Sequence, residues 1–250
     1  MFDPRLSLLD KKLENIKNII LFGSGKGGVG KSVISSAIAY ILSERDYSVA
    51  YIDLDFYGPS GQNLFPVDTQ FKGGREGIEL PVSDNVRVMS IGYMLGDNPF
   101  PIAGKEKIDL LIDLFSILNF PNLDFMVIDL PPGMGDELTF TQRLFKDKVS
   151  IAVVTTSSEL SLNVVSRLVR YLKVENIRTL GVIINMANLF GEYSPIQIGQ
   201  KLQLEVLGTV SYYPELEQFK TIREKIENVP EFRRQLREIV DSILDKLNPF

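Results

Sequence analysis

A glycine-rich segment near the N-terminus has the residue types and spacing of a phosphate-binding loop. Residues 25–32 fit the pattern G-x-x-x-x-G-K-[ST] and lie between an apolar run and a segment with helical spacing. Glycines let successive backbone N–H groups turn toward one point, and the dipole of the following helix adds partial positive charge there. We therefore predict a nucleotide-binding P-loop made of Gly25, Lys26, Gly27, Gly28, Val29, Gly30, Lys31 and Ser32.

Three side chains of this loop carry the predicted chemistry. Lys31 would reach the β- and γ-phosphates, and Ser32 would give its hydroxyl to Mg²⁺. An ordinary P-loop does not need a second lysine near its start, so Lys26 requires its own explanation. Either Lys26 is a solvated side chain on a glycine loop, or its charge serves a second set of phosphates.

Acidic residues end two of the apolar runs that follow. Asp53 and Asp55 close one run, and Asp129 closes Phe125–Asp129, the pattern of a Walker B acid. Because ligands bind at the carboxyl ends of parallel strands, we expect these carboxylates beside the P-loop. Period-two spacing turns Asp53 and Asp55 to the same side, so that one can lie near the metal while the other orients the attacking water. Asp129 would hold Mg²⁺ directly or through water.

An amide follows another apolar run, at Asn185 in Gly181–Asn185. Asn185 could read the edge of a base, although asparagine at such a place is also common in turns. No Asn-Lys-x-Asp sequence, which reads guanine, occurs anywhere in the chain. We therefore predict ATP rather than GTP as the nucleotide.

The elements that must position these residues follow from the apolar pattern. The predicted strands are Asn18–Phe22, Ser48–Asp53, Val86–Ile91, Phe125–Leu130, Ser150–Thr155, Thr179–Asn185 and Val206–Tyr212. Helical spacing appears between most of them, for example in Val33–Leu42, Ile108–Phe115 and Val164–Leu172. This alternation predicts an α/β fold, with a mainly parallel β-sheet and helices on both faces, as in P-loop NTPases.

The remaining segments fit one domain over residues 1–250. Asp3–Lys17 is predicted to form a short helix before the first strand, and residues 56–85 and 187–200 are predicted to be loops that carry function. Glu231–Leu247 has one apolar helical stripe, and its acidic residues favour packing on the domain over membrane binding.

Composition excludes several kinds of chemistry. The chain has no cysteine and no histidine, which excludes disulfides, thiolate-held clusters and histidine-based catalysis within the chain itself. Any metal must therefore sit on oxygen ligands, as Mg²⁺ does. The net charge of −5 disfavours a polyanion as the default partner. We see neither a signal sequence nor an apolar run long enough to span a bilayer, and predict a cytoplasmic protein.

With these motifs the chain resembles the Mrp family, which includes ApbC-type and eukaryotic nucleotide-binding iron–sulfur carriers, within the deviant Walker A class of MinD and ParA. The resemblance lies in residues 23–32, 53–60, 128–136 and 181–186. It implies a homodimer on ATP binding, in which Lys26 crosses to the partner's phosphates. It also implies that Asp55 orients water and that Asn185 contacts adenine, which leaves Asp53 to the metal.

The chain departs from the family pattern where iron would be held. Mrp proteins typically carry Cys-x-x-Cys after the strand matching Thr179–Met186, whereas residues 187–194 here contain no thiol. We therefore expect no iron–sulfur cluster on this chain alone. Asn98–Lys105 also lacks the family's Arg-Gly-Pro, and Met134 stands where threonine is usual.

Two functions remain open from the sequence. The first is an ATPase accessory to metallocofactor assembly, acting with a protein partner that bears the cysteines. The second is a partitioning or positioning switch acting on DNA, membrane or a protein partner, and a regulatory nucleotide-binding module with little turnover is a third alternative. Candidates for a basic DNA-binding face are the groups Arg167, Arg170 and Lys173, and Arg233, Arg234 and Arg237. The acidic neighbours of these residues favour ordinary solvated helix faces.

Overall fold

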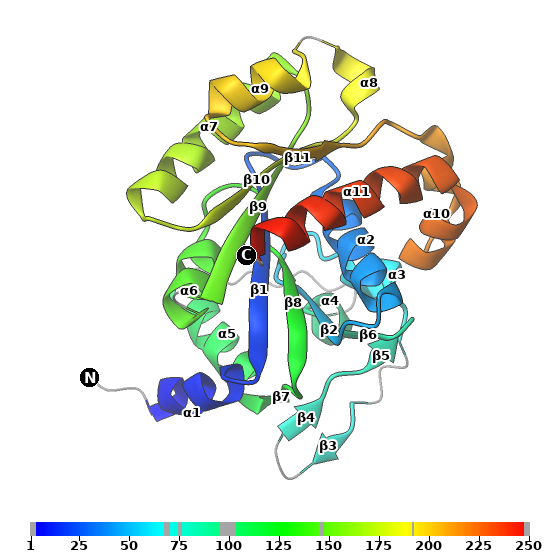
Figure 1. Ribbon diagram of the computed structural model, residues 1–250. Coiled ribbons are helices and arrows are strands. Elements are labelled where there is room, and N and C mark those ends of the chain that lie inside the picture. The colour runs from blue at the N-terminus through cyan, green and yellow to red at the C-terminus, as the bar shows by residue number, and fades with distance from the viewer. Residues whose placement is uncertain are drawn as a thin grey trace.

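The computed structural model describes residues 4–67, 71–74, 77–95, 104–145, 148–191 and 193–247, built around an eight-stranded sheet of order β11-β10-β9-β1-β8-β2-β6-β5 (Figure 1). Its strands are β1 (Ile16–Ser24), β2 (Val49–Asp53), β5 (Val82–Ser83), β6 (Val86–Ser90), β8 (Leu123–Asp129), β9 (Val149–Thr155), β10 (Thr179–Ile184) and β11 (Val206–Thr209). The central pairs are parallel, and β5 alone among these strands runs antiparallel to its neighbour, β6. The predicted fold class is confirmed.

Helices cover both faces of this sheet, because successive strand side chains alternate between them. In β1, Ile19 and Leu21 join one buried cluster, whereas Ile20 and Phe22 join the other. The first cluster lies under α1 (Pro4–Leu13), α5 (Lys105–Ile117), α6 (Asp136–Phe145), α7 (Glu159–Val174) and α9 (Pro195–Leu202). The second lies under α2 (Lys31–Glu44), α3 (Gly61–Leu64), α10 (Ile222–Asn228) and α11 (Pro230–Leu247). In Figure 1, α1, α5, α6 and α7 lie on the left of the molecule, α2 and α10 lie on the right, and α11 runs from the centre toward α10.

Short elements complete the described chain. They are α4 (Gly92–Leu95), α8 (Ala187–Phe190), a 3₁₀ turn at Pro214–Gln218, and a small sheet of β3 (Gly73–Gly74), β4 (Gly77–Glu79) and β7 (Leu118–Asn119). None of these strands was expected from the sequence, because they are too short to show any period.

Three predicted segments differ from the structure. The predicted loop 56–85 contains α3, β3, β4 and β5. The first helix ends at Leu13 rather than at Lys17, because Ile16 is fully buried and pairs with Leu123 of β8 as the start of β1. The predicted loop 187–200 contains α8 and most of α9. A capping box explains α9, since Ser194 Oγ accepts from the Gln197 backbone and the Gln197 side chain accepts from the Ser194 backbone. Of the atypical stretch Asn98–Lys105, residues 98–103 lie outside the described part of the chain.

The C-terminal helix packs on the domain, as predicted. Its apolar stripe of Phe232, Leu236, Ile239, Val240 and Ile243 is buried in the cluster that also contains α2. Ion pairs from Arg233 to Glu44 at 2.6 Å and from Arg45 to Asp241 at 2.5 Å join α11 to α2. In the described residues, no helix combines the length and apolar character that crossing a membrane requires.

The loop after β8 is hydrogen-bonded to the end of its neighbour β1 at the carboxyl edge of the sheet. Leu130 N–H donates to the Phe22 carbonyl at 3.2 Å, and Gly133 N–H donates to the Ser24 carbonyl at 2.8 Å. These bonds join the loop after β8 to the end of β1. From β1 the chain continues to β2 on one side of the sheet, whereas β9 lies on the other side of β1. Open α/β sheets bind ligands at a point where the strand order reverses in this way.

Candidate nucleotide-binding site

The loop between β1 and α2 has the backbone that its glycines predict. Gly28 and Gly30 have φ values of 77° and 78°, in the left-handed region that residues with a Cβ atom rarely adopt. A Cβ at Gly30 would also lie 2.2 Å from Asn185 Nδ2, whereas one at Gly28 would meet nothing within 4 Å. The loop is therefore closely packed at Gly30, against Asn185, and open at Gly28.

The Walker A and Walker B residues meet directly beneath this loop. Lys31 Nζ donates to Asp129 Oδ1 at 2.6 Å, and Ser32 Oγ donates to Asp129 Oδ2 at 2.5 Å. Ser35, which the sequence analysis missed, donates its hydroxyl to Asp129 Oδ1 at 3.0 Å. Lys31 and Asp129 are both buried, so each charge compensates the other. The structure thus brings together three residues that were predicted from the sequence, Lys31, Ser32 and Asp129. Their contacts with phosphate and Mg²⁺ remain predictions.

The donor set at this point fits Mg²⁺. Ser32 and Asp129 place two hard oxygens side by side, the donor type that this ion takes. Within the described ranges, no group of three or more acidic side chains could hold a metal by itself. The remaining ligands of a cation here would therefore be phosphate oxygens and water.

Asp53 differs from the expectation that it faces a metal. Its Oδ1 accepts from the Asp55 backbone N–H at 3.0 Å. Its Oδ2 accepts from the N–H groups of Ser60 and Gly61 and from the Ser90 hydroxyl, at 2.8–3.0 Å. The side chain is fully buried and does not line the nucleotide pocket. This geometry favours a role in holding the loop after β2 over direct contact with a cation.

Asp55 lies outside the strand, so period-two spacing does not apply to it. Its Oδ1 accepts from the backbone N–H groups of Tyr57 and Gly58 at 3.0 and 3.1 Å, which orients the carboxylate in a turn. Asp55 lines the same pocket as the P-loop. Its position is compatible with the predicted role of orienting a water molecule.

The P-loop opens into a pocket of about 420 Å³. Besides the loop residues 26–33 it is lined by Ser24, Asp55, Gly58, Ser60, Asn63, Leu64, Pro132, Glu217, Lys220 and Lys225. Glu217, Lys220 and Lys225, which come from the segment after β11, were not predicted from the sequence. Their signal was available in Thr221-x-x-Glu224, a capping box that starts α10. The buried ammonium of Lys225 donates to the backbone carbonyl of Phe219 at 2.6 Å and fixes this wall, and burial lowers its pKa.

Asn185 lies behind the loop rather than on the pocket wall. Its Nδ2 donates to the Val29 carbonyl at 2.9 Å, and its side chain is buried. The structure therefore gives Asn185 a part in holding the P-loop. Contact with adenine stays a prediction.

Lys26 lines the pocket and is partly exposed. Its backbone carbonyl accepts from Ser24 Oγ at 3.0 Å, which fixes the start of the loop. Within the described residues, no carboxylate forms an ion pair with its ammonium. A positive charge with no ion-pair partner among the described residues therefore lies beside the pocket.

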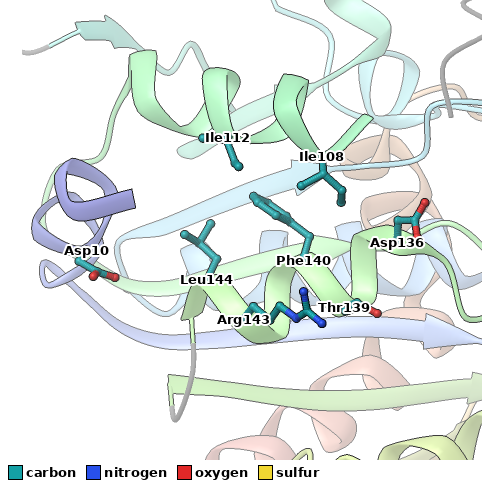
Figure 2. Close-up of a pocket in the computed structure, with 8 residues that line it drawn as sticks. All are labelled: Asp10, Ile108, Ile112, Asp136, Thr139, Phe140, Arg143 and Leu144. Carbon is teal, nitrogen blue, oxygen red and sulfur yellow. The ribbon is translucent and has the colours of Figure 1, made fainter. Parts of the chain in front are cut away.

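A second hollow of about 540 Å³ lies elsewhere, between α1, α5 and α6. Figure 2 shows Ile108 and Ile112 of α5 facing Phe140 and Leu144 of α6 across it. Its remaining lining residues are Asp10, Asp136, Thr139 and Arg143. This hollow has no phosphate-binding backbone, and we do not assign the nucleotide to it.

Comparison with known proteins decides the family. The sequence pattern of the ParA family described as NUBPL iron-transfer P-loop NTPase matches residues 15–246. The chain belongs to this family. The resemblance to nucleotide-binding iron–sulfur carriers is confirmed, for a member that contains no cysteine.

Curated relatives of the chain carry related names. It is 35% identical over 208 residues to an iron-sulfur cluster carrier protein of Rickettsia felis, covering 82% of this chain and 64% of the relative. A protein of the same name from Aquifex aeolicus is 35% identical over 226 residues, covering 82% and 60%. The chain thus spans less than two thirds of the length of these relatives. A cytosolic Fe-S cluster assembly factor Nubp1 homolog of Drosophila sechellia is 29% identical over 98% of this chain and 86% of its own.

Solved structures agree with the fold. A nucleotide-binding protein from Archaeoglobus fulgidus, in complex with ADP, has a TM-score of 0.76 at 26% identity and covers 91% of this chain and 95% of its own. The cell division ATPase MinD of Pyrococcus furiosus has a TM-score of 0.71 at 18% identity, over 92% and 99%. At that identity the likeness to MinD concerns the fold alone.

Proposed function

We propose that this NUBPL-type NTPase is an ATP-dependent switch, which binds ATP with Mg²⁺, forms a homodimer and hydrolyses ATP slowly. One observation carries the proposal: Lys31, Ser32 and Asp129 meet at one buried point beneath a pocket that Asp55 and Lys26 also line. The ADP complex of the Archaeoglobus protein supports a nucleotide at the corresponding place.

In this proposal each side chain has a separate task. Lys31 neutralises the β- and γ-phosphates, and Ser32 and Asp129 hold Mg²⁺, which would lower the charge on the phosphates when bound. Asp55 accepts a hydrogen bond from the attacking water and aligns it with the γ-phosphorus. Lys26 neutralises charge on the phosphates of the partner subunit, as an arginine finger does.

For the cellular role, we propose an ATPase accessory to iron–sulfur handling that works with an unidentified, cysteine-bearing protein partner. The names of the relatives support this role, and the absence of cysteine requires that the thiolates come from elsewhere. Anaerobic reconstitution of the purified chain with iron and sulfide should leave no stable cluster. A stoichiometric iron–sulfur absorbance band on the chain alone would contradict this role.

The missing thiols also favour a second function, a partitioning or positioning switch of the ParA and MinD kind. Its support on α11 is weak, because the basic residues that could face DNA are paired. Arg233 pairs with Glu44, and Arg234 pairs with Glu231 and Glu238. On the α11 face, a protein partner therefore fits this second function better than DNA does.

Nucleotide binding tests the core of the proposal. Lys31→Ala should weaken ATP binding at least tenfold in calorimetry, because it removes a charge-assisted contact to the phosphates. Lys26→Ala is the matched control, since it removes the other lysine of the same loop and should leave the affinity of the monomer nearly unchanged. Unchanged ATP affinity in a folded Lys31→Ala protein would refute the P-loop assignment.

A further inference from the structure

One oxygen of the Asp129 carboxylate is held by two donors at once. Its Oδ1 accepts from Lys31 Nζ at 2.6 Å and from Ser35 Oγ at 3.0 Å, whereas its Oδ2 accepts from Ser32 Oγ at 2.5 Å. Asp129 and Ser35 have no exposed surface, and Lys31 is buried as well. The orientation of this carboxylate therefore depends on donors that the chain itself supplies.

In the proposed function, Lys31 cannot keep its place on Asp129. Its ammonium lies on the carboxylate that would hold Mg²⁺ together with Ser32, and like charges at one buried point repel strongly. The phosphates attract the same ammonium through charge-assisted hydrogen bonds of their own. We expect Lys31 to turn from Asp129 to the phosphates when ATP and Mg²⁺ bind. Oδ1 of Asp129 then loses its charged donor.

Ser35 is the donor that remains on Oδ1. Its hydroxyl has one proton and, besides Asp129, a second acceptor in the Ser32 carbonyl at 3.1 Å. Once the ammonium has left, the carboxylate is the better of the two acceptors, because a charged acceptor forms the stronger hydrogen bond. Ser35 lies one turn beyond Lys31 on α2, so its hydroxyl keeps its place when the Lys31 side chain moves.

A second buried hydroxyl lies close to Ser35. Tyr51 of β2 is fully buried, and its hydroxyl has no hydrogen-bond partner among the described residues. Burial raises the pKa of Tyr51 well above its usual value, and the charge of Asp129 raises it further. The Ser35 hydroxyl lowers it, so the two hydroxyls are neighbours. A buried polar atom without a partner is costly, and this one has a proton to give to Ser35.

We propose that Ser35 is a positioning residue for the cation of this site. It holds Oδ1 of Asp129 after Lys31 has turned to the phosphates, and thereby keeps Oδ2 beside Ser32, where the two oxygens would bind Mg²⁺. Tyr51 supports it by donating to the Ser35 oxygen, which directs the Ser35 proton to the carboxylate. This role rests on the proposed function and adds the residues that keep the site in shape for the cation.

The same helix offers a matched control. Ser36 is fully buried like Ser35, and its hydroxyl bonds to carbonyls of its own helix, that of Ser32 at 2.7 Å and that of Val33 at 3.1 Å. Ser35→Ala and Ser36→Ala therefore remove the same atom from the same buried helix, with the same gain in helix propensity. Of the two, only Ser35→Ala takes a donor from Asp129.

Calorimetry of ATP binding, with Mg²⁺ and with EDTA, separates the cation from the nucleotide. Each substitution is made in the Asp55→Ala protein, in which ATP should persist because the carboxylate proposed to orient the attacking water is absent. We expect Ser35→Ala to reduce the gain in ATP affinity from Mg²⁺ about tenfold, the effect of losing one hydrogen bond to a charged group. Ser36→Ala should keep the parental gain.

A merely structural role of Ser35 would lower both affinities alike. An equal Mg²⁺ gain in Ser35→Ala and in the parent would therefore overturn the positioning role although the nucleotide site stands. If the parent itself gains no affinity from Mg²⁺, the proposed Mg²⁺ site falls, and the role of Ser35 falls with it.

A further variant tests the part of Tyr51. Tyr51→Phe removes a buried hydroxyl that has no partner in the described structure, so it should not lower the free energy of unfolding. It should nevertheless reduce the Mg²⁺ gain several-fold, because the Ser35 proton is then free to return to the Ser32 carbonyl. A Tyr51→Phe protein with the full parental gain would overturn the part given to Tyr51.

Discussion

At the scale of single residues, one buried carboxylate gathers the groups on which nucleotide chemistry depends. Asp129 accepts from Lys31, Ser32 and Ser35 at once, so loss of any one of these donors changes the position of the others. Asp53, at the end of the neighbouring strand, instead holds backbone N–H groups of the loop that carries Asp55.

The pKa of Asp53 reflects the burial of its carboxyl group and can be measured by titration. Burial, and then the nearby charge of Asp129, raise the pKa of Asp53 to about 6, against hydrogen bonds from the Asp55 and Gly61 backbones that lower it. Its unfolded-state pKa is about 3.9, so the folded state binds this proton more tightly. The free energy of unfolding contributed by Asp53 therefore falls as pH rises from about 4 to about 6, and is constant above that.

Carbon-13 NMR of labelled aspartate carboxyls gives the pKa directly. The Asp53 signal is assigned by its absence from Asp53→Asn, and we expect its midpoint near pH 6, as the raised pKa requires. A midpoint near about 4, the value of an unperturbed aspartate, would mean that the hydrogen bonds outweigh burial.

The P-loop can be recognised from the sequence because its spacing is local and its chemistry is fixed by the phosphate. Ser35 could not be predicted, because its partner Asp129 comes within reach only once the helix and the strand are placed. The hydrogen bonds of Asp53 could not be predicted for a different reason. An aspartate at a strand end can face either a cation or backbone N–H groups. The conformation of the following loop decides which of the two it faces, and the sequence does not reveal that conformation.

At the scale of elements, α5 links the two loops that flank the nucleotide pocket. Its Lys107 forms a buried ion pair with Glu137, which opens α6 after the loop that follows β8. The same ammonium lies 4.7 Å from the ring centroid of Tyr57 and 5.2 Å from that of Phe56, both in the loop after β2. Burial would lower the pKa of Lys107, and the hydrogen bond and charge of Glu137 raise it above its usual value.

This link predicts different effects on stability and on turnover. Lys107→Met should lower the free energy of unfolding by about 3 kcal/mol, because it leaves the buried Glu137 carboxylate without a partner. Lys107→Met with Glu137→Leu should recover most of that stability, since no unpaired charge remains. Both proteins should hydrolyse ATP several-fold more slowly, because Lys107 no longer ties the Phe56–Tyr57 loop to α6.

Urea unfolding and ATP turnover measured on the single and double variants separate these effects. Helix α6 was not among the segments expected to be helical, whereas α5 was predicted from apolar periodicity, which is strong for long helices. The pairing of Lys107 with Glu137 was not, because periodicity does not reveal which charged residues of two helices face one another. Parental turnover in the stable double variant would show that the link has no role in hydrolysis.

At the scale of the whole molecule, the proposed switch has two states, which differ in whether a second copy of the chain is bound. A ligand shifts such an equilibrium only by its differential affinity for the two states. ATP would bridge both copies through Lys26, whereas ADP lacks the γ-phosphate that a lysine from the partner would reach. Hydrolysis would therefore release the dimer.

Light scattering with the Asp55→Ala protein tests this claim most directly. We predict a dimer with ATP and Mg²⁺ and mostly monomer with ADP, and we predict that adding Lys26→Ala keeps the protein monomeric while it still binds ATP. An oligomeric state that responds neither to the nucleotide nor to Lys26 would contradict the switch.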